Sequence, residues 1–179
     1  MSKALLIIDM QKFVTDRIQQ GIAFYPEKSI ENMMDVVATF RAAGQPVIHI
    51  RHQTIAAGSA LHQDSPLSLP IESFEALANE PVFIKNTSSA FNSTPLLSYL
   101  QDDQLSEVTV IGAVAGFCVN STVRTGADFG LNMTVIKDAV ISFDLQSHQP
   151  GAEDIHHVTM ALLGADFAQV ITTTELAVN

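Results

Sequence analysis

Residues 108–122 read Val108-Thr-Val-Ile-Gly-Ala-Val-Ala-Gly-Phe-Cys-Val-Asn-Ser-Thr122. A continuous apolar run over 108–111 passes through a glycine-containing turn into a segment with helical spacing, which is typical of a buried strand followed directly by a helix. Cys118, the one cysteine of the chain, falls at this junction. Backbone N–H groups and the positive end of a helix dipole are expected there to lower the pKa of the thiol. A free cysteine is otherwise most often an inert packing residue.

Similar apolar runs occur at 5–9, 47–50, 82–84, 133–136 and 168–171. Continuous rather than alternating apolar runs predict strands that are buried on both faces of a parallel sheet. Helical spacing lies between these runs, over 30–40, 94–100, 119–129 and 155–163. The expected fold is therefore α/β: a three-layer α-β-α arrangement with a six-stranded, mostly parallel sheet and helices on both faces, in a single domain over 1–179.

Charge and composition limit the partners of this chain. Its 179 residues include 9 Lys+Arg and 19 Asp+Glu, for a net charge of -10. Nucleic acids and anionic membranes favour basic surfaces, so neither is an expected partner. No apolar run approaches the roughly 18 residues of a membrane span, and the apolar stretch near Met1 is too short for a signal peptide. The sequence predicts a soluble, cytoplasmic protein without an internal disulfide.

Polar side chains follow the ends of four predicted strands. Asp9 closes the first run, Arg51 and His52 follow the second, Lys85 follows the third, and the fourth leads to Cys118. Ligands of open α/β sheets bind beyond the carboxyl ends of the strands, so these side chains are expected at one rim. Each alone has an ordinary alternative as a turn residue or a solvated strand end. Together they supply a thiol, a base for its proton and a cation that favours the thiolate, which nucleophilic hydrolysis needs.

Three segments resemble the signature blocks of the isochorismatase-like cysteine hydrolases. They are Leu5-Leu-Ile-Ile-Asp-Met-Gln11, Val82-Phe-Ile-Lys-Asn-Thr-Ser-Ser-Ala-Phe91 and Gly112-Ala-Val-Ala-Gly-Phe-Cys-Val-Asn-Ser-Thr122. The family includes nicotinamidases, N-carbamoylsarcosine amidase, ureidoacrylate and biuret amidohydrolases and streptothricin hydrolase-like enzymes. The resemblance covers almost the whole chain. It implies that Cys118 is the nucleophile, Asp9 the general base and Lys85 the third member of a catalytic triad.

The same resemblance implies further features of the site. The backbone N–H groups of Val114 and Cys118 would form the oxyanion hole, with a cis peptide bond between Ala113 and Val114. Asp138 would lie at the rim, at the end of the fifth strand, in a structural role. Assembly as a homodimer or homotetramer is also expected.

Departures from the family pattern narrow the chemistry. Nicotinamidases carry a metal-binding Asp-x-His pair after the second strand, where this chain has His49-Ile-Arg-His-Gln53. We therefore expect no catalytic metal and no cofactor. Isochorismatases that cleave a vinyl ether do not use a cysteine at the position of Cys118. Its presence favours hydrolysis of a C–N bond in a small amide, urea or carbamate.

A long irregular stretch over 52–80 is expected to be a functional loop or lid with a helical turn near 73–78. Candidates for substrate binding lie in or near the three segments that resemble the family and at the end of the second predicted strand. Adjacent His156 and His157 are expected on different faces of a helix, which argues against a shared metal. The candidate substrate-binding residues are Gln11, Phe13, Arg51, His52, Phe91 and Phe117.

Two other functional classes stay open on the sequence alone. The first is a binding or interaction module on the same fold without hydrolase activity. The second is a redox sensor in which Cys118 is oxidised rather than acylated.

Overall fold

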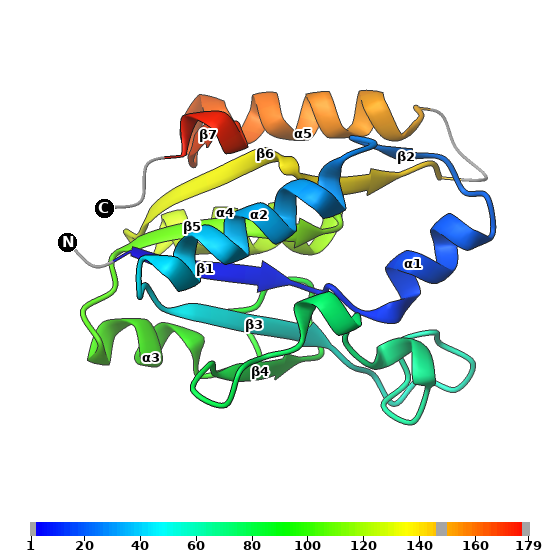
Figure 1. Ribbon diagram of the computed structural model, residues 1–179, viewed down its shortest axis with the longest axis horizontal. Helices are drawn as coiled ribbons and strands as arrows, with labels where there is room; N and C mark the ends of the chain where they lie inside the picture. The colour runs from blue at the N-terminus through cyan, green and yellow to red at the C-terminus, as the bar shows by residue number, and fades with distance from the viewer. Residues whose placement is uncertain (1–2, 146–149, 177–179) are drawn as a thin grey trace.

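The fold is centred on one mostly parallel sheet, as seen in a computed structural model that describes residues 3–145 and 150–176. The strand order is β2-β6-β5-β1-β3-β4, and β7 pairs with β6 (Figure 1). The strands are β1 (Lys3–Ile8), β2 (Phe24–Tyr25), β3 (Val47–His52), β4 (Val82–Lys85), β5 (Glu107–Ala113), β6 (Asn132–Phe143) and β7 (Gln169–Ile171). The six predicted strands are confirmed and pair in parallel. The additional strand, β2, pairs antiparallel with the end of β6 and is too short to give an apolar run.

Helices cover both faces of the sheet. They are α1 (Lys12–Gln19), α2 (Ser29–Ala42), α3 (Leu96–Asp102), α4 (Asn120–Asp128) and α5 (Ala152–Asp166). The four predicted helices are confirmed, whereas α1 was not predicted because it buries only Phe13 and Val14. Short 3₁₀ turns lie at Pro66–Ser68, Glu72–Phe74 and Thr173–Glu175, the second of them close to the helical turn expected near 73–78. None of the helices in the described ranges is long and apolar enough to span a membrane.

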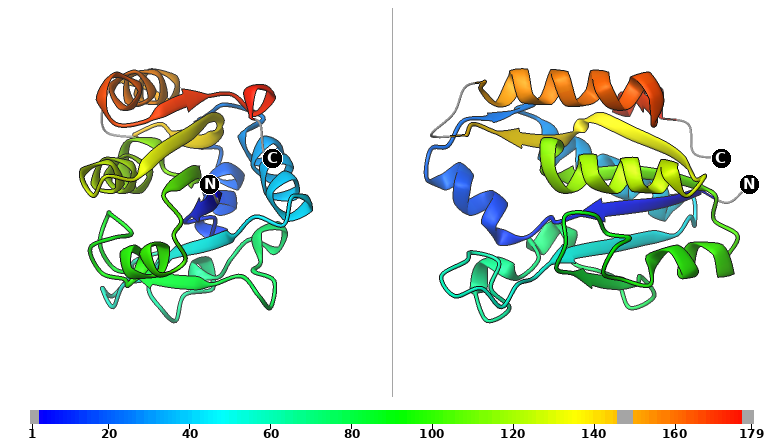
Figure 2. Two further views of the ribbon diagram at one scale, coloured as in Figure 1. Left: turned by 90° about the vertical axis from the view of Figure 1, so that its left-hand side faces the viewer. Right: turned by 180° about the vertical axis from the view of Figure 1, so that it is seen from behind.

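Two apolar cores flank the sheet, and β1 contributes to both. Its side chains alternate, so Leu6 and Ile8 pack with α3, α4 and α5, whereas Leu5 and Ile7 pack with α1 and α2. Figure 2 shows these helices as separate layers on the two faces. Burial on both faces is the reason that this strand is continuously apolar.

Asp138 was expected at the rim, at the end of a strand, but it lies within β6. β6 continues past Asp138 to Phe143, with an irregularity in its pairing with β5 between Val110 and Gly112. The Asp138 carboxylate accepts hydrogen bonds from the backbone N–H (2.8 Å) and the hydroxyl (3.0 Å) of Thr173. It therefore ties β6 to the C-terminal 3₁₀ turn, in the structural role that was expected for it.

A buried ionic cluster fixes the start of β4 to its neighbours. Glu80 accepts hydrogen bonds from Arg41 Nε (2.7 Å) and contacts His49 Nε2 (2.8 Å), and its side chain is 5% exposed. Burial opposes ionisation of Glu80, but hydrogen bonds from Arg41, from the backbone of Leu77 and from His49 outweigh it and lower the pKa to about 2. His49 lies within β3, as predicted, and is buried.

Glu80→Gln is expected to lower the free energy of unfolding at neutral pH by about 3 kcal/mol. The folded pKa of Glu80, about 2, lies below its ordinary value of 4.5. The carboxylate therefore stabilises the fold fully above pH 4.5, and this contribution is lost as the pH falls toward 2. Urea denaturation at several pH values measures the difference, which should shrink on acidification. Exposed Glu27→Gln is the control, and a pH-independent difference would contradict the prediction.

Candidate functional site

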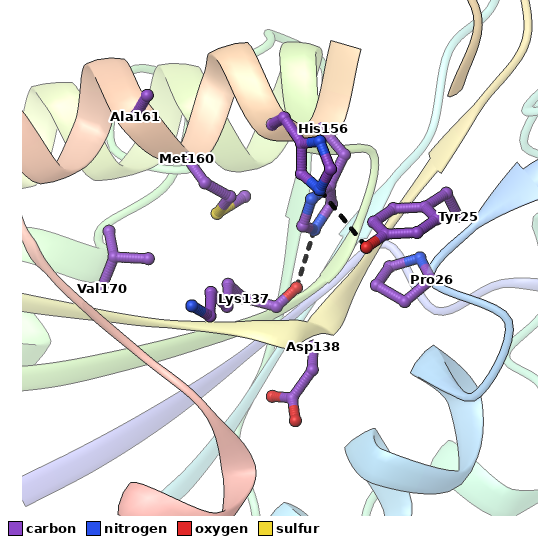
Figure 3. A pocket seen from close by; sticks show the side chains of 9 residues that line it. Tyr25, Pro26, Lys137, Asp138, His156, Met160, Ala161 and Val170 are labelled. Atoms are coloured by element: carbon purple, nitrogen blue, oxygen red, sulfur yellow. Dashed lines mark hydrogen bonds between the residues drawn. The ribbon is translucent and has the colours of Figure 1, made fainter. Parts of the chain in front are cut away.

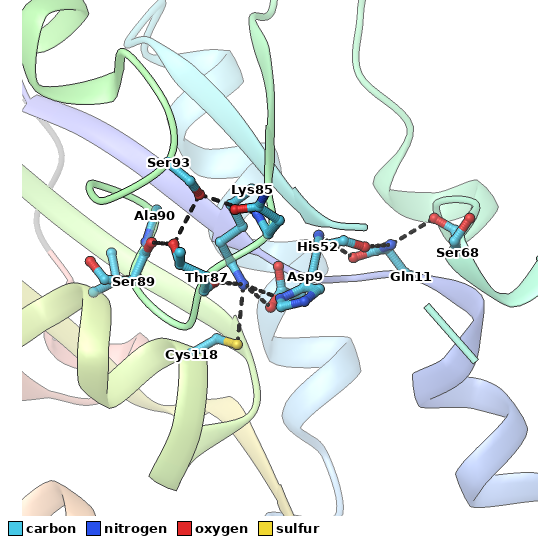
Figure 4. A network of polar contacts seen from close by, with 12 residues as sticks. Asp9, Gln11, His52, Ser68, Lys85, Thr87, Ser89, Ala90, Ser93 and Cys118 are labelled. Atoms are coloured by element: carbon cyan, nitrogen blue, oxygen red, sulfur yellow. Dashed lines mark hydrogen bonds and ion pairs between the residues drawn. The ribbon is translucent and has the colours of Figure 1, made fainter. Parts of the chain in front are cut away.

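Four strand ends bring the candidate side chains together. Asp9 follows β1, His52 and Lys85 are the last residues of β3 and β4, and Cys118 lies in the turn between β5 and α4. In Figure 4 their side chains converge on the Lys85 ammonium. The rim predicted from the sequence therefore exists for these four residues.

Lys85 is the centre of the cluster. Its side chain is fully buried, and Nζ lies 2.9 Å from Asp9 Oδ2 and 2.8 Å from His52 Nδ1. Nζ also donates to the Thr87 carbonyl and to Cys118 Sγ, each at 3.2 Å. An ammonium has three N–H groups, so four acceptors compete for three protons.

Asp9 combines a left-handed backbone with a buried carboxylate. Its φ is 51°, a region that Asp adopts more readily than most residues, and its N–H donates to Ile50 O at 2.9 Å. Oδ1 is buried and has no hydrogen-bond partner among the described residues. Burial raises the pKa of Asp9, and the Lys85 charge opposes this shift without cancelling it. The carboxylate is thus more basic than an exposed one.

The backbone before Cys118 is tightly constrained. Gly112 has φ 120°, and a Cβ there would collide with Ile8 O, so only glycine lets β5 approach β1 at this point. The Ala113–Val114 peptide bond is cis. A π-helical turn, Ala115–Val119, then carries Cys118 directly into α4.

The pKa of the Cys118 thiol differs from the sequence-based expectation. Burial raises it to about 11, and the neighbouring Asp9 carboxylate adds to this, while Lys85 opposes it. The expected lowering of this pKa is therefore wrong, because desolvation and the Asp9 carboxylate together outweigh the Lys85 charge. At neutral pH the resting thiol keeps its proton and needs a base to become a nucleophile.

Comparison with known proteins identifies the family. The sequence model of the isochorismatase domain matches residues 3–175, nearly the whole chain. The chain belongs to the isochorismatase family. It is 32% identical to the isochorismatase family protein YddQ of Bacillus subtilis, over 97% of both chains. It is 25% identical to nicotinamidase 3 of Arabidopsis thaliana, over 97% of this chain and 86% of the relative. The crystal structure of an isochorismatase from Pseudomonas putida superposes with a TM-score of 0.86 at 27% identity, over 98% of this chain and 90% of the other.

In this isochorismatase-family protein, Gln11 was expected to bind substrate, but its side chain points into the protein instead. Its side chain is fully buried: Nε2 donates to His52 O (2.9 Å) and Ser68 O (2.6 Å), and Oε1 accepts from His52 N (2.8 Å). It joins the end of β1 to β3 and to the 52–80 segment. No sequence signal indicated this anchoring, because the partners of Gln11 lie 41 and 57 positions away along the chain.

Three other substrate-binding candidates differ in position, and Phe91 lies in the apolar core against which Cys118 packs. Phe13 and Phe91 are buried in the two apolar cores, on opposite faces of the sheet. Arg51 precedes His52 in β3, so its side chain points to the opposite face. Phe117, by contrast, is 50% exposed directly beside Cys118 and stays a candidate for contact with substrate.

One group of residues has the composition of a metal site. Ligand atoms of Asp9, His52 and Cys118 lie within 4.8 Å of one another, the one such group found in residues 3–145 and 150–176. Lys85 Nζ contacts all three side chains. The group is therefore arranged around an ammonium.

His156 and His157 have separate partners at a cavity of about 520 Å³ beside β2, β6 and α5 (Figure 3). His156 Nε2 lies 2.7 Å from Lys137 O, and His157 Nε2 lies 3.3 Å from the Tyr25 hydroxyl. The two imidazoles thus do not converge on a common ligand. This cavity is lined by Tyr25, Pro26, Lys137, Asp138, His156, His157, Met160, Ala161 and Val170.

Proposed function

We propose that this protein is a cysteine hydrolase that cleaves a C–N bond of a small amide, urea or carbamate through a thioester on Cys118. The observation that carries the proposal is the position of Lys85 Nζ, 2.9 Å from Asp9 Oδ2 and 3.2 Å from Cys118 Sγ. One cation is thus in contact with both the candidate base and the candidate nucleophile.

The first step is transfer of the thiol proton to Asp9. The thiol has a pKa of about 11 and Asp9 a raised pKa, so burial brings a protonated nucleophile next to a strengthened base. The transfer moves one negative charge from the carboxylate to sulfur. Because Lys85 contacts both atoms, the buried charge stays neutralised throughout.

Acylation and release follow from the same groups. The thiolate attacks the carbonyl carbon, a C–S bond forms, and the oxyanion accepts hydrogen bonds from the backbone N–H groups of Val114 and Cys118. Protonated Asp9 then donates its proton to the leaving nitrogen as the C–N bond breaks. Water adds to the thioester carbonyl and releases the acid and the thiol. The similarity to nicotinamidase 3, whose name indicates an amide substrate, supports this class of reaction.

The two alternatives from the sequence have less support. A redox-sensing cysteine needs a low pKa, whereas that of Cys118 is raised to about 11. A module without chemistry has no need for a buried cation held between a carboxylate and a thiol.

A substrate screen tests the proposal. The purified protein is incubated with small amides, ureas and carbamates, and released ammonia is measured against Cys118→Ala as the blank. We expect release from at least one class by the native protein only. Equal release by both proteins would refute the proposal. Sedimentation of the same sample tests the predicted homodimer or homotetramer.

Chelation is expected to leave the activity unchanged. The side chains that could bind a metal already surround the Lys85 ammonium, whose positive charge repels a second cation. Ammonia release is measured before and after dialysis against EDTA. Activity that is lost to EDTA and restored by zinc would show that a metal, rather than Lys85, supplies the charge.

A further inference from the structure

His52 has a contact that a substrate-binding residue does not need. Its imidazole Nδ1 lies 2.8 Å from Lys85 Nζ, the shortest of the four contacts around the ammonium. The two residues are also direct partners in the parallel pairing of β3 with β4. The strand register therefore holds the imidazole against the ammonium.

The contact determines the tautomer of His52. An ammonium can only donate, so Nδ1 must be the accepting nitrogen and Nε2 carries the proton. Burial and the Lys85 charge both lower the pKa of His52, which favours this neutral form. Nε2 has no hydrogen-bond partner in the described part of the chain.

The backbone of His52 is held from the opposite side. Its N–H and C=O form a pair of hydrogen bonds with the Gln11 amide, at 2.8 and 2.9 Å, and Gln11 also binds Ser68 O. All of these groups are neutral. His52 thus offers Lys85 a neutral acceptor at a strand end whose backbone is held in place by these hydrogen bonds.

The four acceptors divide into two kinds. His52 Nδ1 and Thr87 O are neutral and fixed, whereas Asp9 Oδ2 and Cys118 Sγ exchange a negative charge in the proposed reaction. Two N–H groups of Lys85 donate to the neutral acceptors. The third N–H group can therefore donate to whichever of Asp9 and Cys118 carries the negative charge. Nζ lies 2.9 Å from Asp9 Oδ2 and 3.2 Å from Cys118 Sγ, so it needs to move little to change from one acceptor to the other.

We propose that His52 is a positioning residue that, together with the Thr87 carbonyl, anchors the Lys85 ammonium. The remaining N–H group of Lys85 then changes its hydrogen-bond acceptor from Asp9 Oδ2 to Cys118 Sγ as the thiolate forms. This inference rests on the proposed hydrolase function. In this role His52 contacts Lys85, whereas the sequence analysis had predicted that it binds substrate.

Substitution separates this role from substrate binding. His52→Ala is expected to lower kcat about 10- to 100-fold with KM within about threefold of wild type, because the ammonium loses an anchor. His52→Asn places an amide oxygen near the position of Nδ1 and should recover most of kcat. His62→Ala, in the 52–80 segment, is the control and should behave as wild type. An unchanged kcat in His52→Ala, an effect on KM alone, or no recovery in His52→Asn would each overturn the proposal.

A measurement without substrate tests the contact independently. Long-range ¹H–¹⁵N correlation spectra of the wild-type protein report the histidine tautomers, and His52→Asn assigns the signal. We expect the Nε2–H tautomer at pH 7. An Nδ1–H tautomer would overturn the anchoring role even if the protein is a hydrolase. Failure of the hydrolase proposal would appear instead as ammonia release by Cys118→Ala or as no release from any compound.

Discussion

Lys85→Met is expected to abolish hydrolysis and to lower the free energy of unfolding by about 3–5 kcal/mol at neutral pH. The Lys85 side chain is fully buried, and its ammonium lies 2.9 Å from the buried Asp9 carboxylate. Methionine fills a similar volume but leaves that carboxylate without a counter-charge. The loss should shrink as the pH falls, because protonated Asp9 needs no cation. Urea denaturation followed by circular dichroism measures the stability, and ammonia release measures the activity.

A double variant identifies the cause of this loss. Adding Asp9→Asn to Lys85→Met removes both charges, so most of the stability should return while activity stays absent. Exposed Lys12→Met is the matched control and should resemble wild type in both measurements. A double variant as unstable as Lys85→Met would show that the ion pair is not the source of the effect.

Cys118→Ala is expected to lower kcat/KM by at least about 10³-fold while the protein stays folded. Sγ is the atom that the proposed mechanism acylates, and the side chain is only partly buried, so truncation leaves the core intact. Mass spectrometry of acid-quenched reactions should show an acyl adduct in the wild type and none in this variant. Because Cys118 is the one cysteine, any thioester is located without ambiguity.

Ser121→Ala, which removes a side-chain atom of similar size in α4, is the control for Cys118→Ala and should keep its activity. Undiminished turnover by Cys118→Ala would remove the nucleophile assignment and, with it, the thioester.

Local sequence was sufficient to place Asp9, Lys85 and Cys118 at one rim. Each follows a continuous apolar run, and parallel strands present their carboxyl ends at a common edge. Three errors in the predicted fold also have local causes, the first being that α1 buries only two residues. β2 has two residues, and β6 continues through an irregularity that hides its end beyond Asp138.

The sequence by itself determined the strands that are buried on both faces and most of the helices, because these depend on periodicity along the chain. The predicted strand ends placed Asp9, Lys85 and Cys118 at one rim, and the resemblance to a known family implied their roles as a triad. Only the tertiary structure decided the burial, the pKa shifts and the hydrogen-bond partners of those side chains. The pKa of the Cys118 thiol is raised because burial and the Asp9 carboxylate outweigh the Lys85 charge, and Gln11 and His52 point into the protein because distant segments supply their partners. Desolvation and hydrogen bonds between residues 33 to 57 positions apart arise only when the chain is folded.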